Sequence, residues 1–155
     1  MVQVDDEAAL VSTFRLGDAL FGIETLVVQE VVPLGRMTLV HHAPDYISGI
    51  INLRGQIVTV IDLTRKLGLD ENTARTTWHI LIVVWLGEHI GLKVDSVADV
   101  VSADMDDLQP LPANIRAADQ KYFRGVCQAG HNLVAVLNLD TVLAEEANEI
   151  TGAGR

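Results

Sequence analysis

Two groups of side chains in this sequence have the chemistry of metal ligands. His41 and His42 are neighbours in the chain, and three carboxylates, those of Asp104, Asp106 and Asp107, are closely spaced. Neighbouring side chains on an extended chain point to opposite sides, and no Cys, His or Asp stands at the spacing that would complete a tetrahedral set around the histidines. The acidic segment lacks the glycine turn and the bidentate Glu of a calcium-binding EF-hand. We therefore expect surface histidines, a solvated acidic loop, no metal and no cofactor.

The other nucleophilic or basic side chains are isolated. His79, His89 and His131 have no evident carboxylate or nucleophile partner, and His89 and His131 stand at or beside predicted turns, where solvated polar residues are expected. Cys127 is the single cysteine, and its place in the strand-like VCQ favours a buried small hydrophobe over a nucleophile. The sequence has no Gly-x-Ser-x-Gly elbow, no phosphate-binding glycine loop and no HExxH helix. We expect no catalytic residues and no enzymatic activity.

One cation occupies the centre of an apolar segment. The sequence SGIINLRGQIVTVIDL, residues 48–63, predicts two β-strands separated by Arg54 and Gly55, because glycine permits a tight reversal and β-branched residues flank it. A hairpin turn does not require arginine. The guanidinium therefore indicates either a specific ion pair or a surface presented to a partner.

Composition limits the class of partner. The chain has 155 residues, a net charge of −10 and 49% hydrophobic residues, as expected for one globular domain or for two very small ones that share a core. A nucleic-acid backbone requires a clustered cationic face, and because Arg and Lys are scattered here we expect no nucleic-acid partner. The longest apolar run, residues 80–86, is too short to span a bilayer, and VQVDDE rather than a leader follows Met1. We expect a cytoplasmic protein with no direct membrane insertion.

The sequence repeats itself in two blocks. FRLGDALFGIETLVVQEVV (14–32) is echoed by VWLGEHIGLKVDSVADVV (84–101), and SGIINLRGQIVTVIDLTRKL (48–67) is echoed by RGVCQAGHNLVAVLNLDTVL (124–143). The order is the same in both halves, at an offset of about 70 to 76 residues, which indicates a duplicated unit of two hairpins.

Each unit is too small to be stable alone. We therefore predict an all-β-dominated fold of two small β-barrels that share a core, within a single domain. The two subdomains would span roughly residues 10–72 and 78–145. Exchange of strands between them is one possible arrangement.

Predicted helices are short. A short helix or an irregular turn fits residues 24–31, and another fits residues 44–49. Asp140 is the predicted N-cap of a C-terminal helix over residues 141–150 that stops at Gly152. Residues 68–77 and 103–120 are polar or contain proline, and they predict loops.

The repeated segments also resemble a known family. SGIINLRGQIVTVIDLTRKLGL, FRLGDALFGIETLVVQEVV, IGLKVDSVADVV and YFRGVCQAGHNLVAVLNLDTVL together are similar to the CheW-like family of bacterial chemotaxis coupling proteins, over residues 10–143. The element Gly-x-x-Asn-Leu-Arg-Gly, followed by an aliphatic strand and Asp-Leu, is the most specific part of the resemblance. The chain departs from the family at Thr59, where proline is frequent, and at His41 and His42.

The resemblance implies a fold, partners and contact residues. The fold is a pair of five-stranded Src-homology-3-like barrels. The partners are the regulatory domain of the histidine kinase CheA and the cytoplasmic tip of methyl-accepting chemoreceptors, which would hold this cytoplasmic adaptor at membrane receptor arrays. The family's contact residues fall here on Val28, Glu30, Gly49, Arg54 and Val97, and Glu30 is the expected ion-pair partner of Arg54.

The residues alone leave two alternatives to a free-standing coupling protein. One is a small β-barrel that binds a metabolite or other ligand, and the other is the excised regulatory domain of a larger chemotaxis protein. The chain has no nucleotide-binding segment and no room for a receiver domain, and it begins with Met1. We therefore expect the free-standing coupling protein.

Overall fold

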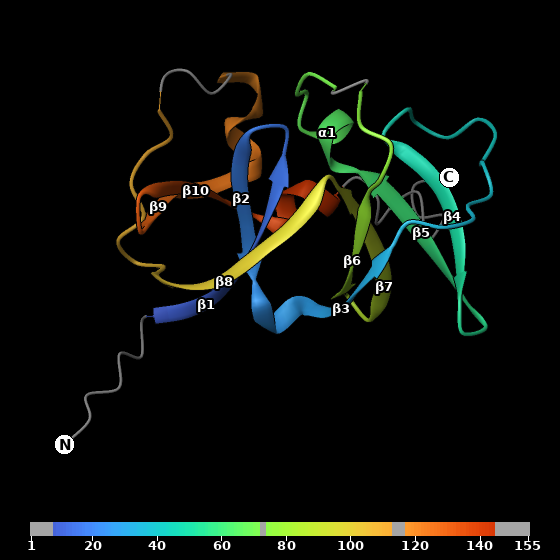
Figure 1. Cartoon of the computed structure of the whole chain (residues 1–155), viewed down its shortest axis with the longest axis horizontal. Helices are drawn as coiled ribbons and strands as arrows, with labels where there is room; N and C mark the ends of the chain where they lie inside the picture. The colour runs from blue at the N-terminus through green and yellow to red at the C-terminus, as the bar shows by residue number, and fades with distance from the viewer. Residues whose placement is uncertain (1–7, 72–73, 113–116, 145–155) are drawn as a thin grey trace.

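The computed structural model describes residues 8–71, 74–112 and 117–144, which form two five-stranded β-sheets. The sheets lie side by side, and the helical stretch at residues 139–144 lies between them (Figure 1). The predicted fold, mostly β with two five-stranded units and short helices, is confirmed.

The strands of each sheet come in a defined order. The first sheet has the order β8-β1-β2-β10-β9, with β1 (Ala8–Leu16), β2 (Ala19–Glu24), β8 (Ser96–Asp104), β9 (Phe123–Ala129) and β10 (Asn132–Leu137). The second has the order β3-β6-β7-β5-β4, with β3 (Val28–Pro33), β4 (Ile47–Leu53), β5 (Gln56–Asp62), β6 (His79–Trp85) and β7 (Glu88–Val94). The short helical elements are η1 (Thr25–Val27), α1 (Leu63–Lys66) and η2 (Ala117–Tyr122).

Each sheet takes strands from both halves of the chain. If β1 is matched with β6, β2 with β7, and so on to β5 with β10, the two sheets have the same strand order. The registers also agree at the one parallel pairing of each sheet, where Phe21 lies opposite Ala135 and the equivalent Ile90 lies opposite Thr59. The internal repeat therefore corresponds to a repeat in topology.

The main hydrophobic core is shared by the two sheets. Phe14 and Phe21 of the first sheet and Leu81 of the second belong to one buried cluster, which Val142 and Leu143 of the helical stretch also join. Fully burying one apolar side chain of this size contributes about 1.5–3 kcal/mol to the stability of the folded state. Because both sheets contribute side chains to this one cluster, the fold is one cooperative unit.

Each sheet is closed by the loop that follows one of its edge strands. After β3, Thr38 exchanges two backbone hydrogen bonds with Ile50 of β4, at 2.9 and 2.8 Å. After β8, Gln109 exchanges two with Val126 of β9, also at 2.9 and 2.8 Å. These loops connect the two edges of each sheet, so that less of each edge is open to pairing with another chain.

Two equivalent glycines permit this closure. Gly49 and Gly125 have φ angles of +158° and +150° and precede Ile50 and Val126. A Cβ on Gly49 would overlap the carbonyl oxygen of Thr38, and one on Gly125 would lie 2.8 Å from the carbonyl oxygen of Gln109. The close approach of the loop to the strand therefore requires glycine.

The predicted helix or turn at residues 24–31 is mostly strand. Only η1 is helical, and β3 starts at Val28, because pairing with β6 outweighs the short helical spacing of the apolar residues. At residues 44–49 a single turn is present, in which the Ile47 amide donates to the Pro44 carbonyl at 3.0 Å, and β4 begins at Ile47. The helix α1 was not predicted.

The C-terminal helical stretch begins at residue 139 rather than at residue 141. Its N-cap is Asn138, whose side-chain oxygen accepts from the Thr141 amide at 3.2 Å, so the prediction of Asp140 as the cap is wrong. Asp140 instead accepts a hydrogen bond from the indole of Trp85 at 2.9 Å. The predicted end of the helix at Gly152 lies outside the described residues.

The loop predictions hold for the described parts of residues 68–77 and for residues 105–112, apart from the single bridge at Gln109. The prediction for 103–120 is wrong at both ends. The strand β8 continues to Asp104 and the 3₁₀ helix η2 begins at Ala117.

We expect Gly49→Ala to lower the free energy of unfolding by roughly 2–4 kcal/mol, because the methyl group meets a backbone oxygen as well as an unfavourable φ. Gly55→Ala is the matched control, since φ there is +86° but a Cβ would meet nothing within 4 Å. It should cost only about 1–2 kcal/mol, the cost of a left-handed residue. Urea unfolding measures both, and equal losses would contradict the packing role of Gly49.

Candidate functional site

The turn between β4 and β5 places Arg54 at its tip. Leu53 pairs with Gln56, so the loop has two residues, Arg54 with φ +52° and Gly55 with φ +86°. Two positive φ angles define a type I′ turn, which Asn-Gly and Asp-Gly favour. The side chain of Asn52 stabilises the turn by accepting from the Gly55 amide at 2.8 Å. Arg54 therefore holds a backbone conformation that arginine does not favour.

Arg54 forms an ion pair with Glu30, as the family resemblance implies. The arginine side chain is 69% exposed and the glutamate side chain 27%, so only the glutamate is shielded from water. The hydrogen bond to Glu30, together with the negative charge of Glu30, raises the pKa of Arg54. The pair connects the tip of the β4–β5 hairpin to β3, which lies at the other end of the strand order.

A second polar link lies beside this ion pair. Nδ1 of His89 is 2.8 Å from Nε2 of Gln56, and its Nε2 is 2.7 Å from Oε1 of Gln29. His89 thus lies at the surface, as the sequence predicts, but both of its ring nitrogens are engaged in exposed hydrogen bonds that the sequence did not predict. No local signal could have shown this, since His89 is 33 and 60 residues from its partners.

These five residues form one end of the second sheet, which we call the mouth: Gln29, Glu30, Arg54, Gln56 and His89. They lie at or next to the starts of β3, β5 and β7, which point in the same direction along the sheet.

Apolar side chains lie close to the mouth in the chain. Val28, at the start of β3, is half-buried against the shared core. Ile57 follows Gln56 in β5, Leu86 is in the turn between β6 and β7, and Leu26 precedes β3, and all three are exposed. Exposed aliphatic residues thus adjoin the polar network in the chain, a composition that suits protein–protein contact.

The other two predicted contact residues lie elsewhere. Gly49 is buried in β4 against Thr38, at a position where the fold itself requires glycine. Val97 is on β8 of the first sheet, opposite Phe14, and is 38% exposed. The position of Val97 in the first sheet is equivalent to that of Val28 in the second, which lies opposite Val83.

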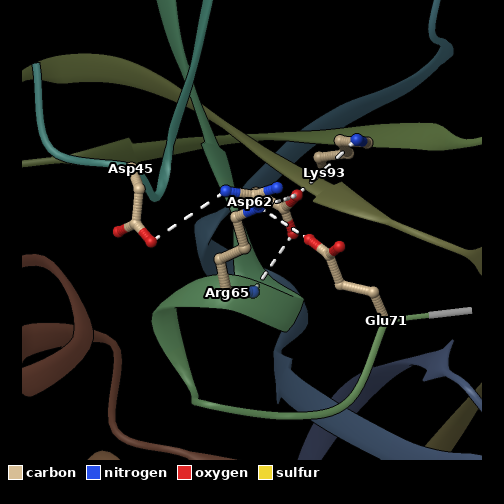
Figure 2. Close-up of polar contacts among 5 residues, drawn as sticks. All are labelled: Asp45, Asp62, Arg65, Glu71 and Lys93. Atoms are coloured by element: carbon tan, nitrogen blue, oxygen red, sulfur yellow. Dashed lines mark hydrogen bonds and ion pairs between the residues drawn. The ribbon is translucent and has the colours of Figure 1, made fainter.

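A separate group of charges surrounds the start of α1 (Figure 2). The side chain of Asp62 accepts from the Arg65 amide at 3.3 Å and lies 3.6 Å from Nζ of Lys93. The Arg65 side chain donates to Glu71 at 2.6 Å and lies 3.9 Å from Asp45. The hydrogen bond and charge of Glu71, with smaller effects of Asp62 and Asp45, raise the pKa of Arg65. This cluster fixes α1 and the following loop to the second sheet.

The candidate metal ligands do not converge on one another. His41 and His42 are exposed in a turn, and the carboxylate of Asp104 accepts from the amide of Asp106 at 3.0 Å within its own loop. Among residues 8–71, 74–112 and 117–144, no three His, Cys, Asp or Glu side chains form a group that could hold a metal. The helices of these same segments include none with the length and apolar character needed to cross a membrane.

Comparison with known proteins gives consistent results. Residues 11–147 match the family model described as a CheW-like domain. The chain is 32% identical over 139 residues to the chemotaxis protein CheW of Rhizobium meliloti, covering 88% of both chains, and 32% identical to that of Klebsiella aerogenes, covering 86% of this chain and 80% of that protein. The crystal structure of the scaffolding protein TtCheW from Thermoanaerobacter tengcongensis matches with a TM-score of 0.78 and 29% identity, over 92% of both chains.

Burial raises the pKa of the Cys127 thiol. Cys127 is half-buried in β9, where the sequence predicts a buried small hydrophobe. A raised pKa leaves less thiolate near neutral pH, so iodoacetamide should alkylate Cys127 several-fold more slowly in the folded protein than in urea at about pH 7. The difference in alkylation rate between the folded and the urea-unfolded protein should become smaller as the pH rises. Mass spectrometry follows the reaction, and faster alkylation of the folded protein would contradict this prediction.

Proposed function

The chain belongs to the CheW-like family of chemotaxis coupling proteins, and from this premise we propose which partners it couples and where each one binds. It is a scaffold and not an enzyme. The proposed partners are the regulatory domain of the histidine kinase CheA and the cytoplasmic tip of methyl-accepting chemoreceptors. Bound to both, the protein would lie in the cytoplasm at membrane receptor arrays.

A coupling protein needs two surfaces that can be occupied at once. The mouth belongs to the second sheet and Val97 belongs to the first, so the two candidate surfaces are on different sheets. We assign the kinase to the mouth, and we assign the apolar face of a receptor helix to the surface around Val97.

The observation that carries the assignment of the mouth is the backbone of Arg54. A left-handed residue other than glycine costs about 1–2 kcal/mol, and asparagine would suit this turn better than arginine does. The ion pair with Glu30 does not offset this cost, because an exposed pair contributes little to stability. Strained residues cluster at functional sites. The exposed guanidinium, held by Glu30, is suited to orient a partner.

Arg54→Asn tests this assignment, because it removes the guanidinium and keeps a residue that the turn favours. We expect the protein to keep or gain stability while its affinity for a kinase regulatory-domain fragment falls roughly tenfold, as for an arginine at the centre of an interface. Isothermal titration calorimetry and thermal melting measure the two effects.

The matched control for Arg54→Asn is Arg124→Asn. Arg124 forms an ion pair with Glu24 outside the mouth, and its side chain is also exposed. This control should bind the kinase fragment normally. Unchanged binding by Arg54→Asn, or an equal loss in the control, would contradict the assignment of the mouth.

Val97→Glu should weaken binding of a receptor fragment by at least roughly tenfold and leave kinase binding within about twofold, because a charge on an apolar contact surface must be desolvated on binding. Val100→Glu is the control, since Val100 is another exposed valine of β8. Pull-down and calorimetry distinguish the partners. Equal loss of both partners, accompanied by unfolding, would show that Val97 serves only the core.

A further inference from the structure

We propose that His89 is a positioning residue of the mouth: its imidazole holds Gln29 and Gln56 across the mouth and thereby fixes Glu30 and Arg54 for the partner. The inference rests on the proposed role of the mouth in binding the kinase. It adds a residue that is not itself expected to touch the partner.

The hydrogen-bonding chemistry of the three side chains is complementary. The amide nitrogen of Gln56 donates to Nδ1 of His89, and Nε2–H of His89 donates to the amide oxygen of Gln29, at 2.8 and 2.7 Å. Both bonds form at once only in the neutral ring with its proton on Nε2. The imidazole is therefore held from both sides in one tautomer.

The bridge connects elements that the backbone does not connect at this end. In the strand order β3-β6-β7-β5-β4, β3 is separated from β5 by two strands, yet Gln29 and Gln56 are joined through one ring. Curling of the sheet brings the starts of these strands together. Gln29 is adjacent to Glu30, and Gln56 is two residues from Arg54, so the bridge and the ion pair join the same two segments.

The two links restrain the same two segments in different ways. The Arg54–Glu30 pair joins two long side chains, one of them largely exposed, and holding such a pair in a single geometry costs side-chain entropy. The bridge passes through the planar, half-buried ring of His89, which is bonded at both nitrogens to exposed glutamines. The bridge therefore adds a second restraint on the separation of β3 from the β4–β5 hairpin, within which the ion pair forms.

The first sheet provides an internal comparison. The register of the repeat identifies the equivalent positions in the first sheet. Ala98 is equivalent to Gln29, Leu20 to His89, and Asn132 to Gln56. The three residues of the first sheet line a hollow of about 490 Å³ between β8 and the β9–β10 turn, where the second sheet has its bridge. A sheet of the same topology thus forms without the bridge, so the fold does not require His89.

The test compares His89→Ala with His89→Gln, which retains a donor and an acceptor, and with the control His131→Ala, which changes a histidine in the β9–β10 turn. We expect His89→Ala to lower affinity for the kinase regulatory-domain fragment roughly three- to tenfold, as loss of two hydrogen bonds that order a surface would. His89→Gln should recover at least part of the loss, and His131→Ala should bind normally. If His89→Ala fails to fold, His89→Gln combined with Gln29→Ala removes the bridge while keeping a large polar side chain at position 89.

A double variant separates positioning from general stability. If His89 acts through Arg54, His89→Ala combined with Arg54→Asn should bind no more weakly than Arg54→Asn alone. Losses of affinity that multiply in the double variant would overturn the inference.

In ¹⁵N NMR of the free protein, the His89 ring should show one tautomer with the proton on Nε2, and two averaged nitrogen signals would also overturn the inference.

The outcomes distinguish this inference from the function on which it rests. If Arg54→Asn weakens kinase binding and His89→Ala does not, His89 has no positioning role and the mouth still binds the kinase. If neither change weakens binding, the assignment of the mouth is itself wrong, and the inference is overturned with it.

Discussion

The structure depends on a core that neither sheet can complete alone. Each sheet has five strands of only six to nine residues, and apolar side chains from both sheets and from the helical stretch at residues 139–144 meet in one buried cluster. Because each sheet also takes strands from both halves of the chain, the two are linked by topology as well as by packing. The shared core fixes the sheets relative to each other, and binding surfaces are therefore expected at the ends and outer faces of the sheets.

The two sheets are closed by backbone in the same way and differ in their side chains. The Thr38–Ile50 and Gln109–Val126 pairs are equivalent, and both depend on a glycine. At the mouth, in contrast, side chains bridge the second sheet, and the equivalent positions of the first sheet line a hollow. The common fold thus requires the glycines, whereas the mouth reflects residues particular to one sheet, as expected of a recognition surface.

Local patterns allowed much of the fold and part of the site to be predicted. The β4–β5 hairpin, the repeat and the Arg54–Glu30 pair follow from short motifs and from the family resemblance. The bridge through His89 could not be predicted, because its partners are remote in sequence and meet only when the sheet curls. Asp140 was mistaken for an N-cap because Asn138, two residues earlier, has equal capping chemistry and is the residue at which the chain leaves β10.

The mouth of the second sheet is the proposed binding site of the kinase. The most direct measurement is a titration of ¹⁵N-labelled protein with the unlabelled regulatory domain of the kinase, followed by backbone amide chemical shifts. We expect the largest changes at residues 29–30, 54–57 and 86–89, with little change along β8 and β9. Changes gathered on β8 and β9, with residues 54–57 unaffected, would contradict this assignment.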